Sequence, residues 1–199
     1  MLKVGITGGI GSGKTLVSEI IDHMGFPVYN ADTEARYLTN NNPFIVKEVK
    51  KLFGDDIYIA QDMDRKRVAQ MVFGNAILLD KLNAIIHPVV AKHFQDWCEI
   101  NSDFQLIFKE AAILFESGAY KQLDRIIAVS APKELRIQRV VDRDGVDAEI
   151  VKRRMAHQMS EEELVAKCDL VIKNDGKDLL TPKVLWAIER LKSSMAKAN

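Results

Sequence analysis

The chain has 199 residues, of which 47% are hydrophobic and 28% charged, an ordinary composition for a globular protein with one sizeable core. Its 28 Lys and Arg residues balance its 28 Asp and Glu residues, so we do not expect a nucleic-acid carrier, which would show a basic footprint. No apolar stretch reaches membrane-spanning length and no signal peptide precedes the first predicted strand. We therefore expect a cytoplasmic protein without a membrane partner.

The cysteines and histidines do not form a metal-binding pattern. Cys98 and Cys168 lie far apart in the sequence, so reduced thiols are the expectation. The four histidines are equally scattered, at His23, His87, His93 and His157. None has the spacing of a metal-ligand motif, so a zinc site built by the protein alone is not expected.

A glycine-rich motif follows the first predicted strand. An apolar run at 2–7 leads into the sequence Gly-Gly-Ile-Gly-Ser-Gly-Lys-Thr at 8–15, and a helical pattern comes next. This is the phosphate-binding loop (P-loop) pattern G-x-x-x-x-G-K-[ST], with the defining positions Gly8, Gly13, Lys14 and Thr15. The alternative is a turn that only joins a strand to a helix, but both flanking elements are those that the motif requires.

The residue types of this loop suit a nucleoside triphosphate with magnesium. Glycines let several backbone N–H groups turn toward phosphate oxygens, and the positive end of the following helix adds to the attraction. Lys14 can reach the β- and γ-phosphates, and the Thr15 hydroxyl can bind Mg²⁺. The loop alone does not say what receives the phosphoryl group.

Between the loop and Gly54 we expect a helix, a short strand and two more helices. Apolar residues at helical spacing continue to Gly25, and 26–29 is predicted as the second strand. The segment 33–39 is expected to be a short helix, and 44–53 a longer one that ends at Gly54.

Asp32 stands directly after the second predicted strand. The carboxyl ends of parallel strands meet at one edge of a sheet, so we expect this carboxylate to face the loop at 8–15. It could orient and deprotonate an acceptor hydroxyl, or hold a water on Mg²⁺. Capping the helix that starts at Thr33 is an equally good role, and one residue could do both. Asn30 is expected to be only a turn residue.

The segment 55–100 is predicted to be largely helical. Asp64 is a candidate N-cap for one helix, and Asn75 can cap a longer one with an apolar face. Pro88 should kink or split the longer helix after His87. His87 could contact an anionic or ribose group, or only fill the helix break. The segment is too long for a simple crossover, so we interpret it as an inserted subdomain that binds the acceptor.

Two further strands are predicted, one at 104–108 that runs on to 110–111 and one at 125–130, and the second has the continuous apolar character of a strand buried on both faces. Glu110 comes at the end of the first and could lie near the metal as a Walker-B-like acid. Glu116 follows in a turn or helix. From position alone, each carboxylate is equally well explained as a solvated or capping group.

Helices that could form a lid are predicted in the segment after residue 131. They are expected at 133–141, 147–158 and 161–167. Pro132 can start the first, and Ser160 with Glu163 forms a capping-box pattern at the start of the last.

Arginines recur in the first of these helices, at Arg136, Arg139 and Arg143. Arg139 and Arg143 share a helix face, and arginine makes bidentate, permanently charged contacts to phosphate. A lid that closes them over ATP would exclude water and neutralise developing charge. The interleaved acidic residues leave a solvated helix face as the alternative, and Arg153 and Arg154 are weaker candidates.

A strand at 170–172 and an amphipathic helix at 180–195 complete the chain. Strands that alternate with helices predict an α/β fold, a P-loop NTPase three-layer sandwich whose five-stranded parallel sheet is flanked by helices. The expected division is a core at 1–54, 101–131 and 168–199, an acceptor-binding helical subdomain at 55–100 and a lid at 132–167.

The motifs in series resemble the dephospho-CoA kinase family, and the resemblance covers nearly the whole chain. The P-loop occurs in many families, whereas the full set in this order is far more specific. The matching segments are 5–15, 30–36, 64–65, 87–88, 114–116, 138–139, 143–144, Gln158 and 171–174. The resemblance implies transfer of the γ-phosphoryl group of ATP to the ribose 3′-hydroxyl of dephospho-CoA, with Mg²⁺ as cofactor.

The resemblance also implies roles for individual residues. Those expected to bind ATP are Gly11, Ser12, Gly13, Lys14, Thr15, Leu16, Arg143, Asn174 and Gly176. Those expected to be catalytic are Asp32, Lys14 and Arg139. Those expected to bind the acceptor are Arg65, His87 and Glu116. Magnesium is expected on Thr15, with Asp32 or Glu110 acting through water.

The chain departs from the family pattern at three places. Ala112-Ile113 stands where the family usually has a proline, and Leu16 replaces a second hydroxyl residue after the P-loop. The family also has an arginine soon after the position of Gln158, where this chain has Glu161. Arg153 or Arg154 could supply the missing cation.

Other functions are compatible with a P-loop. The nearest is another small P-loop kinase that acts on a nucleotide or a shikimate-like acceptor. A GTP-binding switch would need a guanine-reading Asn-Lys-x-Asp segment, and the order and spacing of 173–175 differ from it. An ATP-dependent assembly motor is disfavoured by the short chain. We expect a monomer or a small homo-oligomer.

Overall fold

The computed structural model describes residues 1–196, and the chain divides into two compact units. Met1–Tyr29 and the chain from Asn101 onward form one, which we call the sheet unit; Asn30–Ile100 form the other, the helical unit. The expected 55–100 segment therefore shares a unit with residues 30–54. Among the described residues, no helix is long and apolar enough to cross a membrane.

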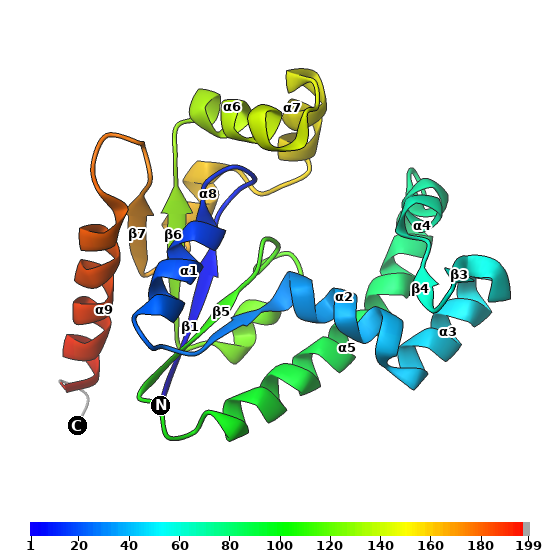
Figure 1. Cartoon of the computed structure of the whole chain (residues 1–199), viewed down its shortest axis with the longest axis horizontal. Coiled ribbons are helices and arrows are strands. Elements are labelled where there is room, and N and C mark those ends of the chain that lie inside the picture. Colours follow the sequence, from blue (N-terminus) through cyan, green and yellow to red (C-terminus); the bar gives the residue numbers. More distant parts are fainter. Residues whose placement is uncertain (197–199) are drawn as a thin grey trace. The chain divides into compact units, whose positions relative to one another are not determined.

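The sheet unit contains the five-stranded parallel sheet that the sequence predicts. Its strands lie in the order β2-β5-β1-β6-β7, and Figure 1 labels β5, β1, β6 and β7 of this sheet. Their bounds are Leu2–Thr7 (β1), Val28–Asn30 (β2), Leu106–Glu110 (β5), Arg125–Ser130 (β6) and Leu170–Lys173 (β7). β1 pairs in parallel with β5 on one side and with β6 on the other. Ile6 is in register with Glu110, so the loop after β1 and the end of β5 lie at the same edge of the sheet.

The helices of the sheet unit follow the predicted order. Their bounds are Lys14–His23 (α1), Lys133–Asp144 (α6), Ala148–Ala156 (α7), Glu161–Ala166 (α8) and Leu180–Ala196 (α9), with a short 3₁₀ helix at Ala119–Gln122 (η2). The Ser160 hydroxyl oxygen accepts from the Glu163 backbone N–H, and the Glu163 carboxylate accepts from the Ser160 backbone N–H. The predicted capping box is therefore confirmed. Gly25, with φ of 83°, follows the end of α1 as expected.

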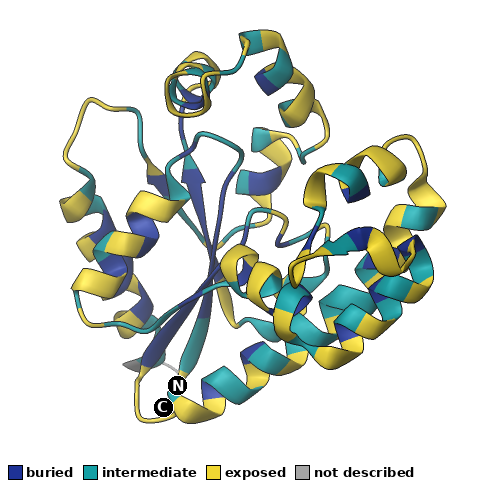
Figure 2. Cartoon of the chain, turned by 45° about the vertical axis from the view of Figure 1, so that its right-hand side comes forward, coloured by how far each residue is buried: buried dark blue, intermediate teal, exposed yellow. Residues whose placement is uncertain are grey.

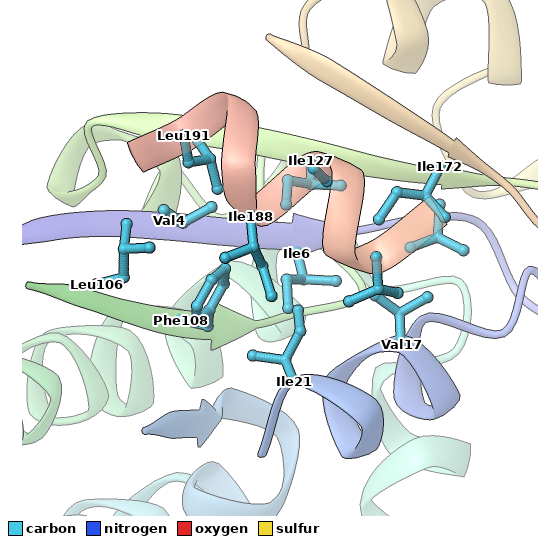
Figure 3. Close-up of a cluster of buried hydrophobic side chains, with 13 residues drawn as sticks. Val4, Ile6, Val17, Ile21, Leu106, Phe108, Ile127, Ile172, Ile188 and Leu191 are labelled. Atoms are coloured by element: carbon cyan, nitrogen blue, oxygen red, sulfur yellow. The ribbon is translucent and has the colours of Figure 1, made fainter. Parts of the chain in front are cut away.

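The core of the sheet unit lies between the sheet and the helices α1 and α9. Figure 3 shows Val4 and Ile6 of β1 facing Ile21 of α1 and Ile188 of α9, and all four side chains are buried. Burying an aliphatic side chain of this size contributes about 1.5–3 kcal/mol, so this cluster fixes α1, and with it the loop before α1, against the sheet. Strand β5 is buried along its whole length, and the dark blue of buried residues predominates in the central strands in Figure 2.

The helical unit is built on one long helix. Its elements are Ala31–Asn41 (α2), Pro43–Phe53 (α3), Asp55–Ile57 (η1), Tyr58–Ile59 (β3), Asp62–Met63 (β4), Arg65–Val72 (α4) and Ala76–Ile100 (α5). Helices α2, α3 and α4 contact α5, and α2 also contacts α3. Ile45, Val49 and Leu82 are among the buried residues of its own core. The unit begins at Asn30 because α2 and α3 bury their apolar faces against α5.

The caps of two helices in this unit are confirmed. The Asp64 carboxylate accepts from the Arg67 backbone N–H at 2.9 Å, and the Asn75 side-chain oxygen accepts from the Leu78 N–H at 3.0 Å. Each side chain thus satisfies a backbone donor that the first turn of a helix leaves without an intrahelical partner.

The structure corrects or refines three expectations. Helix α5 runs through Pro88, so the expected split is wrong, and a kink at this position stays a prediction. The segment 55–100 is largely helical as expected, but strands β3 and β4 form a small antiparallel hairpin in it that the sequence does not predict. The cap of α2 is Asn30, whose side-chain oxygen accepts from the Thr33 N–H at 2.9 Å; Asp32, already inside the first turn, is not the cap.

Candidate active site

The loop at 8–15 has the form that the motif requires. It leaves the end of β1 and enters α1 at Lys14, and the Ser12 N–H donates to Gly9 O at 3.1 Å. Gly11 and Gly13 have φ angles of 77° and 89°, in the left-handed region that favours glycine. These positive φ values let the backbone fold back on itself between strand and helix. Such a turn presents successive N–H groups to an anion, next to the positive end of α1.

Thr15 and Glu110 form the oxygen-rich side of the site. The Thr15 hydroxyl donates to Glu110 Oε1 at 2.8 Å. Glu110 is buried at the end of β5, and this position comes from the pairing of β5 with β1. A hydroxyl and a carboxylate are the hard oxygen donors that Mg²⁺ prefers. Among the described residues, no group of three or more His, Cys, Asp or Glu side chains could hold a metal by itself.

Arg139 reaches the loop from α6. Its Nη1 lies 3.5 Å from both Gly11 O and Ser12 O, and its Nη2 donates to Asn174 Oδ1 at 3.3 Å. Arg143, one turn further along α6, is exposed and pairs with Asp144 at 2.7 Å. The hydrogen bond to Asp144 raises the pKa of Arg143. The structure therefore brings Arg139 to the loop and gives Arg143 a carboxylate partner.

Asn174 holds the loop from the end of β7. Its side-chain amide donates to Ser12 O at 2.9 Å, and its backbone N–H donates to Ser130 O at 2.7 Å. Gly176, with φ of 76°, lies in the turn that follows. The family resemblance implies ATP binding for Asn174, and its direct contact with the phosphate-binding loop is an additional finding.

Three further residues contact the loop or its neighbours without a specific role there being predictable from the sequence: Arg136, Gln158 and Glu161. Arg136 Nε donates to Ile10 O at 3.0 Å, and the Ile10 N–H donates to Gln158 Oε1 at 2.9 Å. Arg136 is 7% exposed and its guanidinium pairs with Glu161 at 2.6 Å. The available signals were the arginine series in α6 and the departure from the family pattern at 161.

Glu116 lies in the sheet unit, at the segment after β5. It is exposed, and its Oε1 accepts from the Met159 N–H at 3.4 Å, next to Gln158. The structure thus places Glu116 beside the connection between α7 and α8. Arg153 is exposed, and Arg154 lies 3.5 Å from Asp144, so neither has a described contact with the loop at 8–15.

The remaining candidates belong to the helical unit. Asp32 is exposed in the first turn of α2. Arg65 is the first residue of α4, and its Nη2 donates to Arg36 O at 3.1 Å. Burial lowers the pKa of Arg65, and the charge of Arg36 lowers it further. His87 is partly buried on α5, and burial lowers its pKa.

Comparisons with known proteins match most of the chain. A sequence model described as dephospho-CoA kinase matches residues 2–179. The dephospho-CoA kinase of Bacteroides fragilis is 39% identical over 94% of this chain and 91% of its own length. The enzyme of the same name from Porphyromonas gingivalis is 40% identical over 97% of this chain and 96% of its own.

Solved structures agree with these matches. A dephospho-CoA kinase from Campylobacter jejuni superposes with a TM-score of 0.71 at 27% identity, covering 96% of this chain and 98% of its own. A shikimate kinase from Acinetobacter baumannii shares the fold with a TM-score of 0.56 at 14% identity, covering 98% of this chain and 94% of its own. The matched residues include the phosphate-binding loop and the helix that carries Arg139. This chain is a P-loop kinase and belongs to the dephospho-CoA kinase family.

Proposed function

We propose that this protein transfers the γ-phosphoryl group of ATP to the ribose 3′-hydroxyl of dephospho-CoA, giving coenzyme A. The chain matches this family over residues 2–179, and one observation in its structure supports the proposal. The P-loop has the positive φ angles at Gly11 and Gly13 that its turn requires, and the Thr15 hydroxyl at its end donates a hydrogen bond to Glu110. The proposal assigns ATP to the sheet unit and the acceptor mainly to the helical unit.

The loop at 8–15 would bind the triphosphate. Ser12 Oγ is buried and has no hydrogen-bond partner among the described residues, although it lies in the middle of the loop. A buried hydroxyl without a partner costs free energy, and a phosphate oxygen or a water that accepts a hydrogen bond from it would remove that cost. Lys14 enters the first turn of α1, where its ammonium would meet the β- and γ-phosphates.

Thr15 and Glu110 would hold Mg²⁺, the Thr15 hydroxyl directly and the carboxylate through water. Two protein oxygens suit this ion, which keeps several waters and takes further ligands from the phosphates. When bound, Mg²⁺ supplies charge neutralisation on the transferring phosphoryl group. The chain's own part is to keep the Thr15 hydroxyl oriented, which the hydrogen bond to buried Glu110 does.

Asp32 is our candidate for the group that takes the proton of the acceptor hydroxyl. Because Asn30 caps α2, Asp32 is not needed for capping, and its carboxylate is exposed. An aspartate within reach of the acceptor would orient the hydroxyl and accept its proton as the new P–O bond forms. Arg139, whose guanidinium lies next to the carbonyls of Gly11 and Ser12, would stabilise the negative charge on the phosphoryl group during its transfer.

Arg65, His87 and Glu116 are our candidates for acceptor binding. Dephospho-CoA carries a pyrophosphate, and the adjacent guanidinium groups of Arg65 and Arg36 suit such an anion. The lowered pKa of His87 keeps its ring neutral near pH 7, so it would serve as a hydrogen-bond partner rather than as a cation.

A phosphoryl-transfer screen tests the proposal. The purified protein with ATP and Mg²⁺ is offered dephospho-CoA, shikimate and nucleoside monophosphates, and the product is identified by mass spectrometry. We expect turnover with dephospho-CoA and phosphate on the ribose 3′-oxygen. Turnover with shikimate or a nucleoside monophosphate alone would favour another small P-loop kinase, and ATP consumption without an acceptor would contradict both.

We also propose a cytoplasmic location and a monomer or small homo-oligomer. Burial raises the pKa of Cys168 to about 11, which keeps the thiol protonated and poorly reactive. Such cysteines fit a reducing compartment, where ATP is also available. Gel filtration with light scattering measures the mass of the particle.

A further inference from the structure

We propose that Glu161, acting through Arg136, positions the phosphate-binding loop for the triphosphate. Both are positioning residues: neither has to touch the nucleotide. The inference rests on the proposed function only in taking ATP as the nucleotide, and it assigns a task to the residue at which this chain departs from the family pattern.

Arg136 is held from both sides. Its Nη1 donates to Glu161 Oε2 at 2.6 Å, while its Nε donates to Ile10 O at 3.0 Å. The side chain of Arg136 is 9% exposed and that of Glu161 is 28% exposed, so the pair is shielded from most of the solvent. The second carboxylate oxygen, Oε1, accepts from the Ser130 hydroxyl at the end of β6. Glu161 therefore links the Arg136 guanidinium to the end of strand β6.

The contact at Ile10 sets the direction of the next N–H group. A trans peptide is planar, and its C=O and N–H point in opposite directions. Since Arg136 holds Ile10 O on its own side, the N–H of Gly11 points to the other side of the loop, away from α6. Asn174 has the same effect two peptides further on. Its side-chain amide donates to Ser12 O at 2.9 Å, so the N–H of Gly13 in the same peptide points away from Asn174.

Arg136 packs closely against two glycines of the loop. A side chain at Gly9 would meet the guanidinium, and one at Gly11 would meet the backbone carbonyl of Arg136. The loop and the first turns of α6 therefore fit against each other without space between them. A guanidinium that lost Glu161 would be a buried charge without its carboxylate, and it would leave Ile10 O to reach water.

Glu161→Gln is the test, because it removes the charge and keeps the size of the side chain. We expect the Kd of Mg·ATP, measured by calorimetry, to rise ~10-fold or more, the effect of losing a charge-assisted hydrogen bond. AMP lacks the β- and γ-phosphates of ATP, so its Kd should change less than about 2-fold. A merely structural role would lower the melting temperature without this difference between ATP and AMP.

Glu149→Gln is the matched control. Glu149 pairs with Lys152 at 2.6 Å on α7, like Glu161 with Arg136, but it is 68% exposed and has no described contact with the loop. Its variant should bind Mg·ATP as the wild type does. Equal affinities of the two variants for Mg·ATP would overturn the proposal, as would a parallel loss of AMP binding, or unfolding of Glu161→Gln at the assay temperature.

A double-mutant cycle tests whether Glu161 acts through Arg136. In an Arg136→Gln background the second substitution, Glu161→Gln, should weaken Mg·ATP binding by less than about 2-fold more. Additive losses would mean that Glu161 acts by another route. If the wild type itself does not bind Mg·ATP, the proposed function fails; if it binds and the two Glu→Gln variants match it, only this inference fails.

Discussion

Asn30 and Asp32 have a similar intrinsic preference for the start of a helix, but only Asn30 caps α2 in the structure. Asn30 accepts the Thr33 N–H and so caps α2. Asp32 lies inside the first turn, where its negative charge also favours the positive end of the helix. The separation of these two tasks makes Asp32 testable as a catalytic base, because its loss should not unfold the helix.

For Asp32→Asn we expect kcat to fall about 100-fold or more with dephospho-CoA, the usual share of a general base, while the Kd of ATP changes little. Steady-state kinetics and calorimetry measure the two quantities. Asn30→Ala is the matched comparison: it should lower the free energy of unfolding by ~1 kcal/mol through the lost cap. Activity of Asp32→Asn within a few-fold of the wild type would remove Asp32 from the mechanism.

The burial of His87 predicts a pH dependence of stability. Its pKa in the folded protein lies below the 6.5 of an unfolded chain. Above pH 6.5 the ring is neutral in both states; as the pH falls below 6.5, the unfolded chain takes up a proton first and unfolding becomes easier. This part of the stability is therefore lost between about pH 6.5 and the lower folded-state pKa.

Urea unfolding at pH 7.5 and pH 5.5 measures this effect. The wild type should lose stability at the lower pH, and His87→Gln should lose less of it. His23→Gln, which alters an exposed histidine at the end of α1, is expected to behave like the wild type. Identical pH profiles for the wild type and His87→Gln would show that His87 does not contribute.

At the scale of elements, α5 is informative because it continues through a proline. Pro88 lacks the N–H that would bond to the carbonyl four residues earlier, and its ring crowds that turn. The helix persists because Leu82 and other apolar residues on it pack against the core of the helical unit. Here tertiary packing outweighs a strong local preference.

Pro88→Ala should therefore raise the free energy of unfolding by about 1–3 kcal/mol, because alanine restores the missing hydrogen bond. Thermal and urea unfolding measure the gain. Pro43→Ala is the matched control: Pro43 occupies the first turn of α3, where proline is favoured, so no gain is expected. An unchanged or lower stability of Pro88→Ala would mean that the local backbone requires proline.

The sequence predicts all five strands of the sheet because each is an apolar run followed by a turn or a cap. It does not predict the hairpin of β3 and β4, whose turn contains Ala60 and Gln61 at φ angles of 49° and 78°. Hairpin turns of this kind usually use glycine or asparagine, so the local signal is missing. The hairpin contributes only two short strands to the helical unit.

In the candidate active site, too, only the residues that have a local sequence signal can be predicted. Lys14, Thr15 and the loop glycines follow from one contiguous motif, and the position of Glu110 follows from the parallel order of strands. Arg136 and Glu161 lie on separate helices, and no local pattern joins them. In the sequence the arginine is one of a series and the glutamate is only a departure from the family pattern, because pairing between distant residues depends on the packing of α6 and α8.

At the scale of the whole molecule, ATP should stabilise the protein by mass action. At 100 times its Kd, Mg·ATP is expected to add about 2.7 kcal/mol to the free energy of unfolding. For a chain of this length the melting temperature should then rise by about 5–10 °C. Differential scanning calorimetry measures the rise. Lys14→Met, which removes the ammonium from the loop, should abolish it, and an undiminished rise in that variant would contradict the assigned role.

The contact of the loop with Arg136 also narrows the sequences that can occupy the loop. The pattern G-x-x-x-x-G-K-[ST] leaves positions 9 and 11 open to any amino acid. In this chain Gly11 allows no side chain, because a methyl group there would strike the Arg136 carbonyl, and a methyl group at Gly9 would displace the guanidinium from its place. The amino acids tolerated at these two positions thus depend on a helix more than a hundred residues away in the sequence. Among related proteins, substitutions at positions 9 and 11 should therefore occur together with substitutions at position 136.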